Sequence, residues 1–159
     1  ELKVHSKLLL ITRREELETV RRYAYLSTGN FNEKTSELYT DHGLFTADER
    51  LTREVAAVFE FMADPLAPPP VLQYLLVAPF GLRPGLHKLI DQEIKNARKG
   101  KPAYIILKMN ALQDPAMIAR LYEASQAGVR IELLIRGINS LIPGEAGLSD
   151  HITLRSLVP

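Results

Sequence analysis

The sequence predicts an α/β fold in which mixed sheets are flanked by helices, and the main reason is a change of pattern along the chain. Residues 73–159 alternate between short apolar runs, which are typical of strands, and longer segments whose apolar residues recur at helical spacing. Residues 1–72 instead contain several strand-like runs and one helical segment. The 159 residues are 46% hydrophobic and 25% charged, which is the composition of a packed globular protein and not of a disordered chain.

The first half is expected to form a pair of strands, a third strand and a helix. Residues 2–12 and 20–28 are rich in apolar, β-branched and aromatic types without helical spacing, and residues 37–45 are also predicted to be a strand. Thr46 is followed three residues later by a glutamate, which is the spacing of a capping box, and apolar residues then recur at helical intervals as far as residue 63. We therefore expect a helix that Thr46 caps.

A proline-rich stretch divides the chain. Residues 64–70 contain four prolines, which cannot propagate a helix or lie in the centre of a sheet. The predicted domains are therefore residues 1–72 and residues 73–159. In the second domain the sequence predicts strand, helix, strand, helix, strand and strand over residues 74–78, 86–97, 103–109, 115–127, 129–135 and 152–157. Strands joined through such helices should run parallel, with right-handed crossovers.

Charge and residue usage exclude several classes of protein. Twenty Lys and Arg against nineteen Asp and Glu give a net charge of +1, so we expect no nucleic-acid partner, and any anion site must be local. No apolar run approaches the roughly 18 residues that a membrane-spanning helix needs. The absence of cysteine excludes disulfides, thiolate nucleophiles and cysteine-based metal sites, and it fits a reducing compartment. We therefore expect a soluble, cytoplasmic protein.

The candidate catalytic residues begin with His5 and Lys7, whose side chains should lie on the same face of the first strand. A neutral imidazole can attack phosphorus and hold the phosphoryl group as a phosphoramidate, while an ammonium beside it stabilises the phosphoryl oxygens. Taken alone, this spacing is more typical of an edge-strand histidine beside a solvated lysine. Residues 27–32 (STGNFN) favour the catalytic interpretation, because hydroxyls, a glycine and the carboxamide of Asn30 at a strand end suit phosphate oxygens.

His-x-Lys followed, after a short hairpin, by Ser/Thr-Gly-Asn resembles the half-site of the phospholipase D superfamily. The resemblance implies a phospholipase D-like, or nuclease-like, fold. That superfamily usually has an aspartate five positions after the lysine, and Thr12 takes that position here. The difference at Thr12 argues against a hydrolytic phosphodiesterase.

The wider resemblance is to one branch of that superfamily, the bacterial polyphosphate kinases of the long ATP-using family, which do not keep this aspartate. The similar segments follow one another along essentially the whole chain: VHSKLLLI, RYAYLSTGNFNEKTSELYTDHGLFTAD, LVAPF, LIDQEI, LKMNAL, LYEASQAGVRIELLIRGINSLIPG and LSDHITLRS. Ser27 stands where the family more often has glycine. The resemblance implies an internal fragment of the C-terminal catalytic region, with the C-terminal half of the first phospholipase D-like repeat in residues 1–72 and the N-terminal part of the second in residues 73–159.

What the resemblance implies is reversible transfer of the terminal phosphoryl group of ATP to inorganic polyphosphate, through a phosphohistidine and with Mg²⁺. His5 takes the nucleophile's position, and Lys7 and Asn30 complete its half-site. Tyr39 and Arg136 fall where the family contacts ATP. The family's second catalytic histidine and its magnesium-associated arginines have no counterpart in this sequence, so we assign no metal ligand. The implied partners are ATP or ADP and polyphosphate, and we expect a homo-oligomer and, for the full-length enzyme, peripheral membrane association.

Arg136 is also a candidate from its position alone. It follows the apolar run 131–135 and precedes a glycine, which is where an open α/β sheet presents ligand groups. A guanidinium there can hold phosphate at two points, and the alternative is a salt-bridged arginine at a strand end. Lys108 and Asn110 end another strand, where they could face the same anion or reach solvent.

Other features keep alternatives open. The basic residues between 83 and 108 could bind a polyanion, although those at 95–101 are better explained as complements to a helix C-terminus. His42, His87 and His151 lack metal-ligand spacing and are assigned no role. The competing functions are an HKD-type phosphodiesterase that acts on lipid or nucleic acid, and a polyanion-binding module without catalysis.

Overall fold

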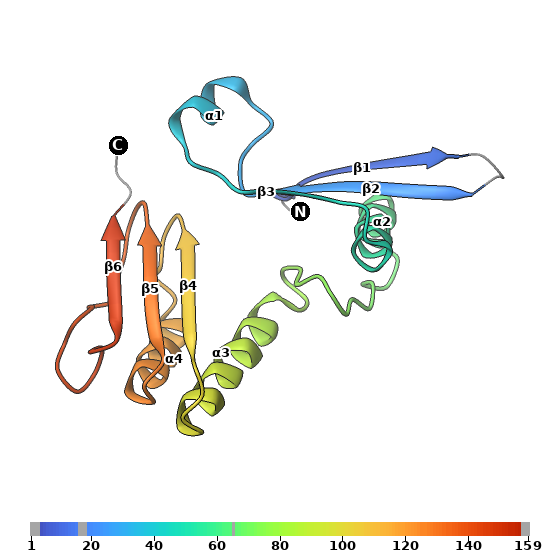
Figure 1. Cartoon of the computed structure of the whole chain (residues 1–159). Coiled ribbons are helices and arrows are strands. Elements are labelled where there is room, and N and C mark those ends of the chain that lie inside the picture. Colours follow the sequence, from blue (N-terminus) through green and yellow to red (C-terminus); the bar gives the residue numbers. More distant parts are fainter. Residues whose placement is uncertain (1–3, 16–18, 65, 157–159) are drawn as a thin grey trace. The chain divides into compact units, whose positions relative to one another are not determined.

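The structure is a computed structural model that describes residues 4–15, 19–64 and 66–156. The chain divides into two compact units, Glu1–Phe80 and Gly81–Pro159, and each contains a three-stranded sheet (Figure 1). The first sheet is antiparallel and the second is parallel, and together with the helices they form the α/β fold that the sequence predicts. The assignment of residues 1–72 and 73–159 to separate repeats stays a prediction. Within the described ranges, no helix is both long and apolar enough to cross a membrane.

The first unit is built on an antiparallel sheet in the order β1-β2-β3, formed by Lys7–Arg14, Val20–Ser27 and Gly43–Thr46. The pairing of β1 with β2 confirms the predicted strand pair. Among the described strands, β1 pairs with β2 alone, so its other edge is unpaired. Helix α2 (Glu49–Ala63) packs on one face of the sheet, where Ala24 is buried (Figure 1).

The predicted strand over residues 37–45 is wrong in its first part, which belongs to helix α1 (Glu33–Leu38) and the segment after it. The side-chain oxygen of Asn32 accepts a hydrogen bond from the backbone N–H of Thr35 at 3.1 Å. The Thr35 hydroxyl donates to the Asn32 carbonyl at 3.0 Å. These local bonds satisfy donors at the start of the segment, and they stabilise a helical turn in place of an extended chain.

Helix α2 ends near residue 63 as predicted, but its N-cap is Asp48 and not Thr46. The Asp48 carboxylate accepts a hydrogen bond from the backbone N–H of Arg50 at 2.9 Å. The Arg50 guanidinium also donates to this carboxylate, which lowers the pKa of Asp48 to about 2. The hydroxyl of Thr46 instead accepts from the N–H of Asp48 at 3.1 Å, so it orders the residue that caps the helix.

The predicted strand over residues 74–78 does not form. The carboxylate of Glu54, on α2, accepts hydrogen bonds from the backbone N–H groups of Gln73 at 2.7 Å, Tyr74 at 3.0 Å and Leu75 at 2.8 Å. Glu54 is only 6% exposed. Because one buried carboxylate satisfies three successive backbone donors, this segment is anchored to a helix and needs no strand partner.

The second unit has the helices and strands that the sequence predicts for this part of the chain. The elements are α3 (Leu82–Arg98), β4 (Tyr104–Met109), α4 (Pro115–Gln126), β5 (Arg130–Ile135) and β6 (Ile152–Ser156). The three strands are parallel and lie in the order β4-β5-β6, so the predicted parallel arrangement is confirmed.

The helix starts and stops of this unit follow local rules. Asp114 caps α4, and its carboxylate accepts a hydrogen bond from the N–H of Met117 at 2.9 Å. Gly128 follows the helix with a φ of 92°, a left-handed conformation that glycine adopts without steric strain.

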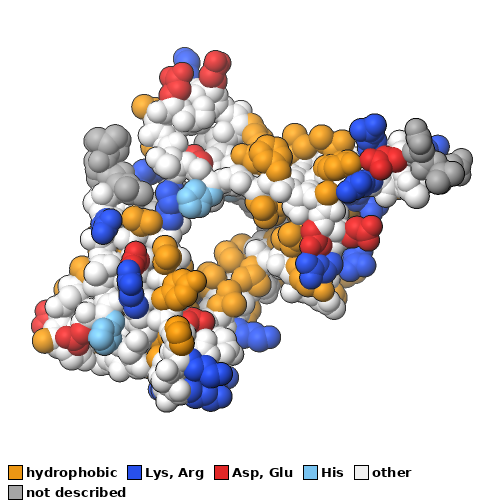
Figure 2. Space-filling model, in the orientation of Figure 1, with side chains coloured by type: hydrophobic (Ala, Val, Ile, Leu, Met, Phe, Trp, Pro, Cys, Tyr) orange, Lys and Arg blue, Asp and Glu red, His pale blue; other side chains and the backbone are white. Residues whose placement is uncertain are grey.

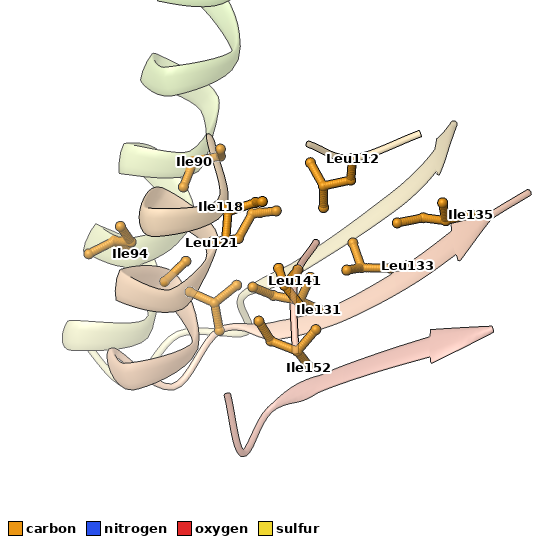
Figure 3. Close-up of a cluster of buried hydrophobic side chains, with 12 residues drawn as sticks. Ile90, Ile94, Leu112, Ile118, Leu121, Ile131, Leu133, Ile135, Leu141 and Ile152 are labelled. Atoms are coloured by element: carbon orange, nitrogen blue, oxygen red, sulfur yellow. The ribbon is translucent and has the colours of Figure 1, made fainter. Parts of the chain in front are cut away.

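The core of the second unit lies between its two helices and one face of its sheet (Figure 3). The buried side chains that Figure 3 labels come from both helices, two strands and two loop positions: Ile90, Ile94, Leu112, Ile118, Leu121, Ile131, Leu133, Ile135, Leu141 and Ile152. The opposite face of the sheet is open, since Tyr104 is 65% exposed and Ile106 is 57% exposed. Burial on one face alone fixes which side chains the other face presents.

We expect Glu54→Gln to weaken the attachment of the 73–75 segment to α2. A glutamine keeps only one acceptor oxygen and adds an amide donor that faces other donors, so we expect a loss of about 1–3 kcal/mol in the free energy of unfolding. Hydrogen exchange by mass spectrometry should show faster exchange in peptides that cover residues 73–75. Glu60→Gln, an exposed change on the same helix, is the matched control and should leave these amides unchanged.

Candidate functional site

The structure brings His5 and Lys7 together. The Lys7 Nζ atom lies 3.1 Å from Nδ1 and 3.2 Å from Nε2 of His5, and it donates to the His5 carbonyl at 2.9 Å. The predicted convergence of the two side chains is therefore confirmed, although His5 lies two residues before β1 and not within a strand. An imidazole attacks phosphorus through an unprotonated ring nitrogen, and an ammonium beside the ring can bind the oxygens of the group under attack.

The loop after β2 lies at the same end of the sheet as this pair. Lys7 is directly opposite Ser27 in the register of β1 and β2. Because the strands are antiparallel, the residues before Lys7 and those after Ser27 emerge at one end of the hairpin. The structure therefore places Lys7, and His5 before it, at the same end of the hairpin as residues 27–30 (STGN).

Asp41 and His42 hold this loop. The hydroxyl of Thr28 donates to the Asp41 carboxylate at 2.8 Å, and the same hydroxyl accepts from the N–H of His42 at 3.0 Å. The backbone N–H of Thr28 donates to the His42 carbonyl at 3.0 Å. The sequence pattern assigned no role to Asp41, and only the structure shows that this residue holds the loop.

Gly29 is needed in the loop because its backbone lies very close to the Asp41 side chain. A Cβ atom on Gly29 would lie 2.6 Å from the Asp41 Oδ2 atom and 2.8 Å from its Cβ atom, which is too close for any non-bonded contact. The N–H of Gly29 donates to the Ser27 hydroxyl at 2.9 Å. Gly29 therefore lets the loop lie directly against the carboxylate that anchors it.

Aromatic contacts hold the other side of the loop. The ring of Phe31 packs against Tyr25 with a centroid distance of 5.9 Å, and Tyr25 packs against Phe45 at 4.3 Å. Asn30 lies between the Asp41 contact and this aromatic cluster, and its side chain is exposed. The loop is therefore held on both sides of Asn30, whose carboxamide is exposed and carries both a donor and an acceptor; its role in binding phosphate stays a prediction.

Tyr39 lies at the C-terminal end of α1, on the segment that returns to the loop. Its side chain is 40% exposed, and its backbone N–H donates to the Thr35 carbonyl at 3.2 Å. The structure therefore places Tyr39 within two residues of Asp41, and not in the strand that the sequence predicts. Its proposed contact with ATP stays a prediction.

In the second unit, Arg136 and Asn110 lie next to each other at the carboxyl ends of β5 and β4. The N–H of Arg136 donates to the Met109 carbonyl at 3.3 Å, and that of Gly137 donates to the Asn110 carbonyl at 2.7 Å. The side chain of Arg136 is half-buried. Arg136 follows one strand and Lys108 and Asn110 end another, as the sequence predicts, and the structure shows that the two strands are neighbours. The binding roles of these residues stay predictions.

One member of the basic stretch between residues 83 and 108 has a structural partner. Arg83 forms an ion pair with Asp114, the residue that caps α4, and this hydrogen-bonded contact lowers the pKa of the Asp114 carboxyl. Lys95 and Arg98 lie in the last turn of α3, where basic residues complement the helix dipole. A continuous polyanion track along this stretch is therefore not supported at Arg83.

Both parts of the chain match known families. The family described as polyphosphate kinase C-terminal domain 1 matches residues 1–68, and the one described as polyphosphate kinase C-terminal domain 2 matches residues 75–159. The chain is 50% identical over 157 residues to polyphosphate kinase of Escherichia coli K12, which covers 99% of this chain and 22% of that relative. It is 52% identical over 157 residues to polyphosphate kinase of Yersinia pestis, which covers 99% of this chain and 23% of that relative.

A solved structure shares the fold. The crystal structure of polyphosphate kinase from Porphyromonas gingivalis matches with a TM-score of 0.84 and 41% identity, over 99% of this chain and 26% of that one. The chain thus spans about a fifth to a quarter of the length of these relatives. Both the resemblance drawn from the sequence and the predicted fold class are confirmed. The chain belongs to the polyphosphate kinase family, and its two parts correspond to the C-terminal domains 1 and 2 of that family.

Proposed function

We propose that a full-length polyphosphate kinase carrying this sequence transfers the terminal phosphoryl group of ATP reversibly to inorganic polyphosphate through a phosphohistidine at His5. The observation that carries this proposal is the contact of 3.1 Å between His5 and the Lys7 ammonium, at the end of the hairpin that also presents the STGN loop. The names of the relatives support the reaction class. None of the comparisons favours a phosphodiesterase or a binding module.

In the proposed reaction, two displacements occur at one phosphorus atom. An unprotonated ring nitrogen of His5 attacks the terminal phosphorus of ATP, the bond to the bridging oxygen breaks, and ADP leaves with that electron pair. A terminal oxygen of polyphosphate then attacks the same phosphorus, and the P–N bond breaks to restore His5. The Lys7 ammonium stabilises the phosphoryl oxygens in both steps, and the Asn30 carboxamide donates to them.

Tyr39 and Arg136 are the proposed ATP contacts of this chain. The half-buried guanidinium of Arg136 suits two-point binding of phosphate, and the exposed face of Tyr39 suits contact with the nucleotide. Phosphoryl transfer of this class uses a divalent cation, which we propose is Mg²⁺. Within the described part of the chain, no cluster of three or more acidic or histidine side chains could hold a metal ion. We therefore propose that the cation binds through the phosphate oxygens of the nucleotide.

The first prediction for this function concerns His5. In the full-length kinase, γ-labelled ATP should give an acid-labile, alkali-stable label on the protein, and His5→Ala should abolish it because no nucleophile remains to form the P–N bond. His87→Ala, at a histidine with no assigned role, is the control and should label normally. Normal labelling of His5→Ala would contradict the proposal. Release of product from a phosphodiester without labelling would favour a phosphodiesterase, and polyphosphate binding without labelling would favour a binding module.

The second prediction concerns Gly29. A Cβ atom at this position displaces the Asp41 carboxylate, so Gly29→Ala should lower the rate of phosphohistidine formation about 10- to 100-fold, as expected for a small misplacement of reacting groups. Gly81→Ala is the matched control, since a Cβ atom there meets nothing within 4 Å. Rapid-quench labelling and a thermal melt separate a positioning effect from unfolding. A wild-type labelling rate in Gly29→Ala would show that the loop does not need this contact.

We also propose that the full-length enzyme is a cytoplasmic homo-oligomer that associates peripherally with a membrane. The unpaired edge of β1 supports self-association, because an exposed strand edge readily pairs with another chain. Fractionation of cells that express the full-length kinase, with and without a high-salt wash of the membranes, checks the location. Recovery of the kinase in a soluble fraction alone would remove the membrane part of this proposal.

The third prediction concerns the 159-residue chain by itself. It should show no ATP-dependent synthesis of polyphosphate, because phosphoryl transfer needs more positioned groups than this chain supplies. It should also self-associate as its concentration rises. A turnover assay and light scattering over a concentration series check the two statements. Robust turnover by a strictly monomeric chain would contradict both.

A further inference from the structure

The open face of the second unit's sheet carries a second set of groups suited to phosphate. The side chains of Ile131, Leu133 and Ile135 on β5 point into the core, so the residues that alternate with them point to the open face. On β4 the same alternation places Tyr104, Ile106 and Lys108 on the open face. In the space-filling view, Lys and Arg side chains lie beside apolar ones over this sheet (Figure 2).

The strand register brings basic residues from two strands, β4 and β6, to one level. Lys108 on β4 is paired with Leu134 on β5, and Leu134 is paired with Arg155 on β6. Residues paired across parallel strands point to the same side, so all three lie on the open face. Arg136 follows Leu134 by two residues and is therefore directed to this face as well. We call Lys108, Arg136 and Arg155 the basic row.

The basic row lies where the three strands end. In Figure 1 the arrowheads of β4, β5 and β6 lie together at one edge of the sheet. Neighbouring strands are about 4.8 Å apart, so Lys108 and Arg155 lie on strands about 10 Å apart, with Arg136 between and beyond them. The carboxyl edge of an open parallel sheet is the usual place for a ligand in an α/β fold.

Arg155 has no acidic partner in the described part of the chain. Its side chain is exposed, and none of the ion pairs formed there includes it. The nearest acidic residue on the open face, Glu132, forms an ion pair with Arg130 at the other end of β5. Basic side chains that gather at one edge of a sheet raise the local concentration of anions there.

We infer that Lys108 and Arg155 of the basic row bind phosphate groups of one polyphosphate chain, beside the ATP contact proposed for Arg136, and that Arg155 is a substrate-binding residue of this surface. The inference rests on the proposed function. Leu134 lies between Lys108 and Arg155 and has no side-chain donor, so the two cations are too far apart to share one phosphate group easily. A polymer that carries a charge on every unit can reach both of them. The guanidinium of Arg155 can hold two phosphate oxygens, and its charge makes the contact dependent on salt.

The test uses the full-length kinase and inorganic polyphosphate of defined length as the probe. Arg155→Gln should raise the Kd for polyphosphate, measured without ATP, about tenfold, which corresponds to about 1.4 kcal/mol. It should also lower the slope of log Kd against log salt concentration by about one, because one ionic contact is lost. Arg155→Lys keeps the charge and should recover the slope. If Arg155 had only a structural role, Arg155→Gln and Arg155→Lys would not differ in this slope.

Two controls separate this inference from the proposed function. Arg130→Gln, at the opposite end of the same face, should leave the Kd for polyphosphate unchanged. Labelling of His5 by ATP and the KM for ATP should stay within twofold of wild type in Arg155→Gln, whereas Arg136→Lys should weaken ATP use and keep the fold. If Arg155→Gln labels normally and its Kd for polyphosphate is unchanged, only the inference about Arg155 is overturned. The same holds if the KM for ATP rises as much as the Kd for polyphosphate. Loss of labelling in the wild type, with Kd still dependent on Arg155, would overturn the proposed function alone.

Discussion

The candidate site of the first unit depends on the close approach between the Gly29 backbone and the Asp41 carboxylate. The same carboxylate accepts a hydrogen bond from Thr28, so the two ends of the segment between β2 and β3 are joined at one point. This joint returns Tyr39 to the end of the hairpin at which Lys7 lies opposite Ser27. The pairing of β1 with β2 then places this loop at the end of the sheet where the His5–Lys7 pair lies.

The second unit also gathers polar side chains in one place, but burial of one face of its sheet does this instead of a single close contact. Its sheet buries one face in a core of isoleucine and leucine side chains, and that burial fixes the register and the facing of every residue on the three strands. Polar and basic residues can then occupy only the open face and the strand ends. Lys108, Arg136 and Arg155 lie on the open face at the strand ends. Several cations therefore gather at one edge of the sheet, although no direct contact between them is needed.

Side chains that accept hydrogen bonds from the backbone account for the differences between expected and observed elements. Asn32 starts α1, which includes the first residues of an expected strand. Asp48 starts α2 in place of Thr46, and Glu54 anchors residues 73–75 in place of a strand. In each case a short polar or acidic side chain satisfies backbone N–H groups that a ladder or another cap would otherwise satisfy. Apolar periodicity does not report these contacts.

The sequence by itself determined the hairpin, the helices α2 to α4 and the parallel strands, because apolar periodicity, caps and prolines act over a few residues. Its resemblance to known sequences along the whole chain indicated the family. It also determined that His5 and Lys7 converge. Only the tertiary structure decided that Asp41 holds the STGN loop, that Glu54 anchors residues 73–75, and that Arg155 lies level with Lys108. These contacts join residues more than ten positions apart, and the sequence pattern at either end does not specify a partner at that distance.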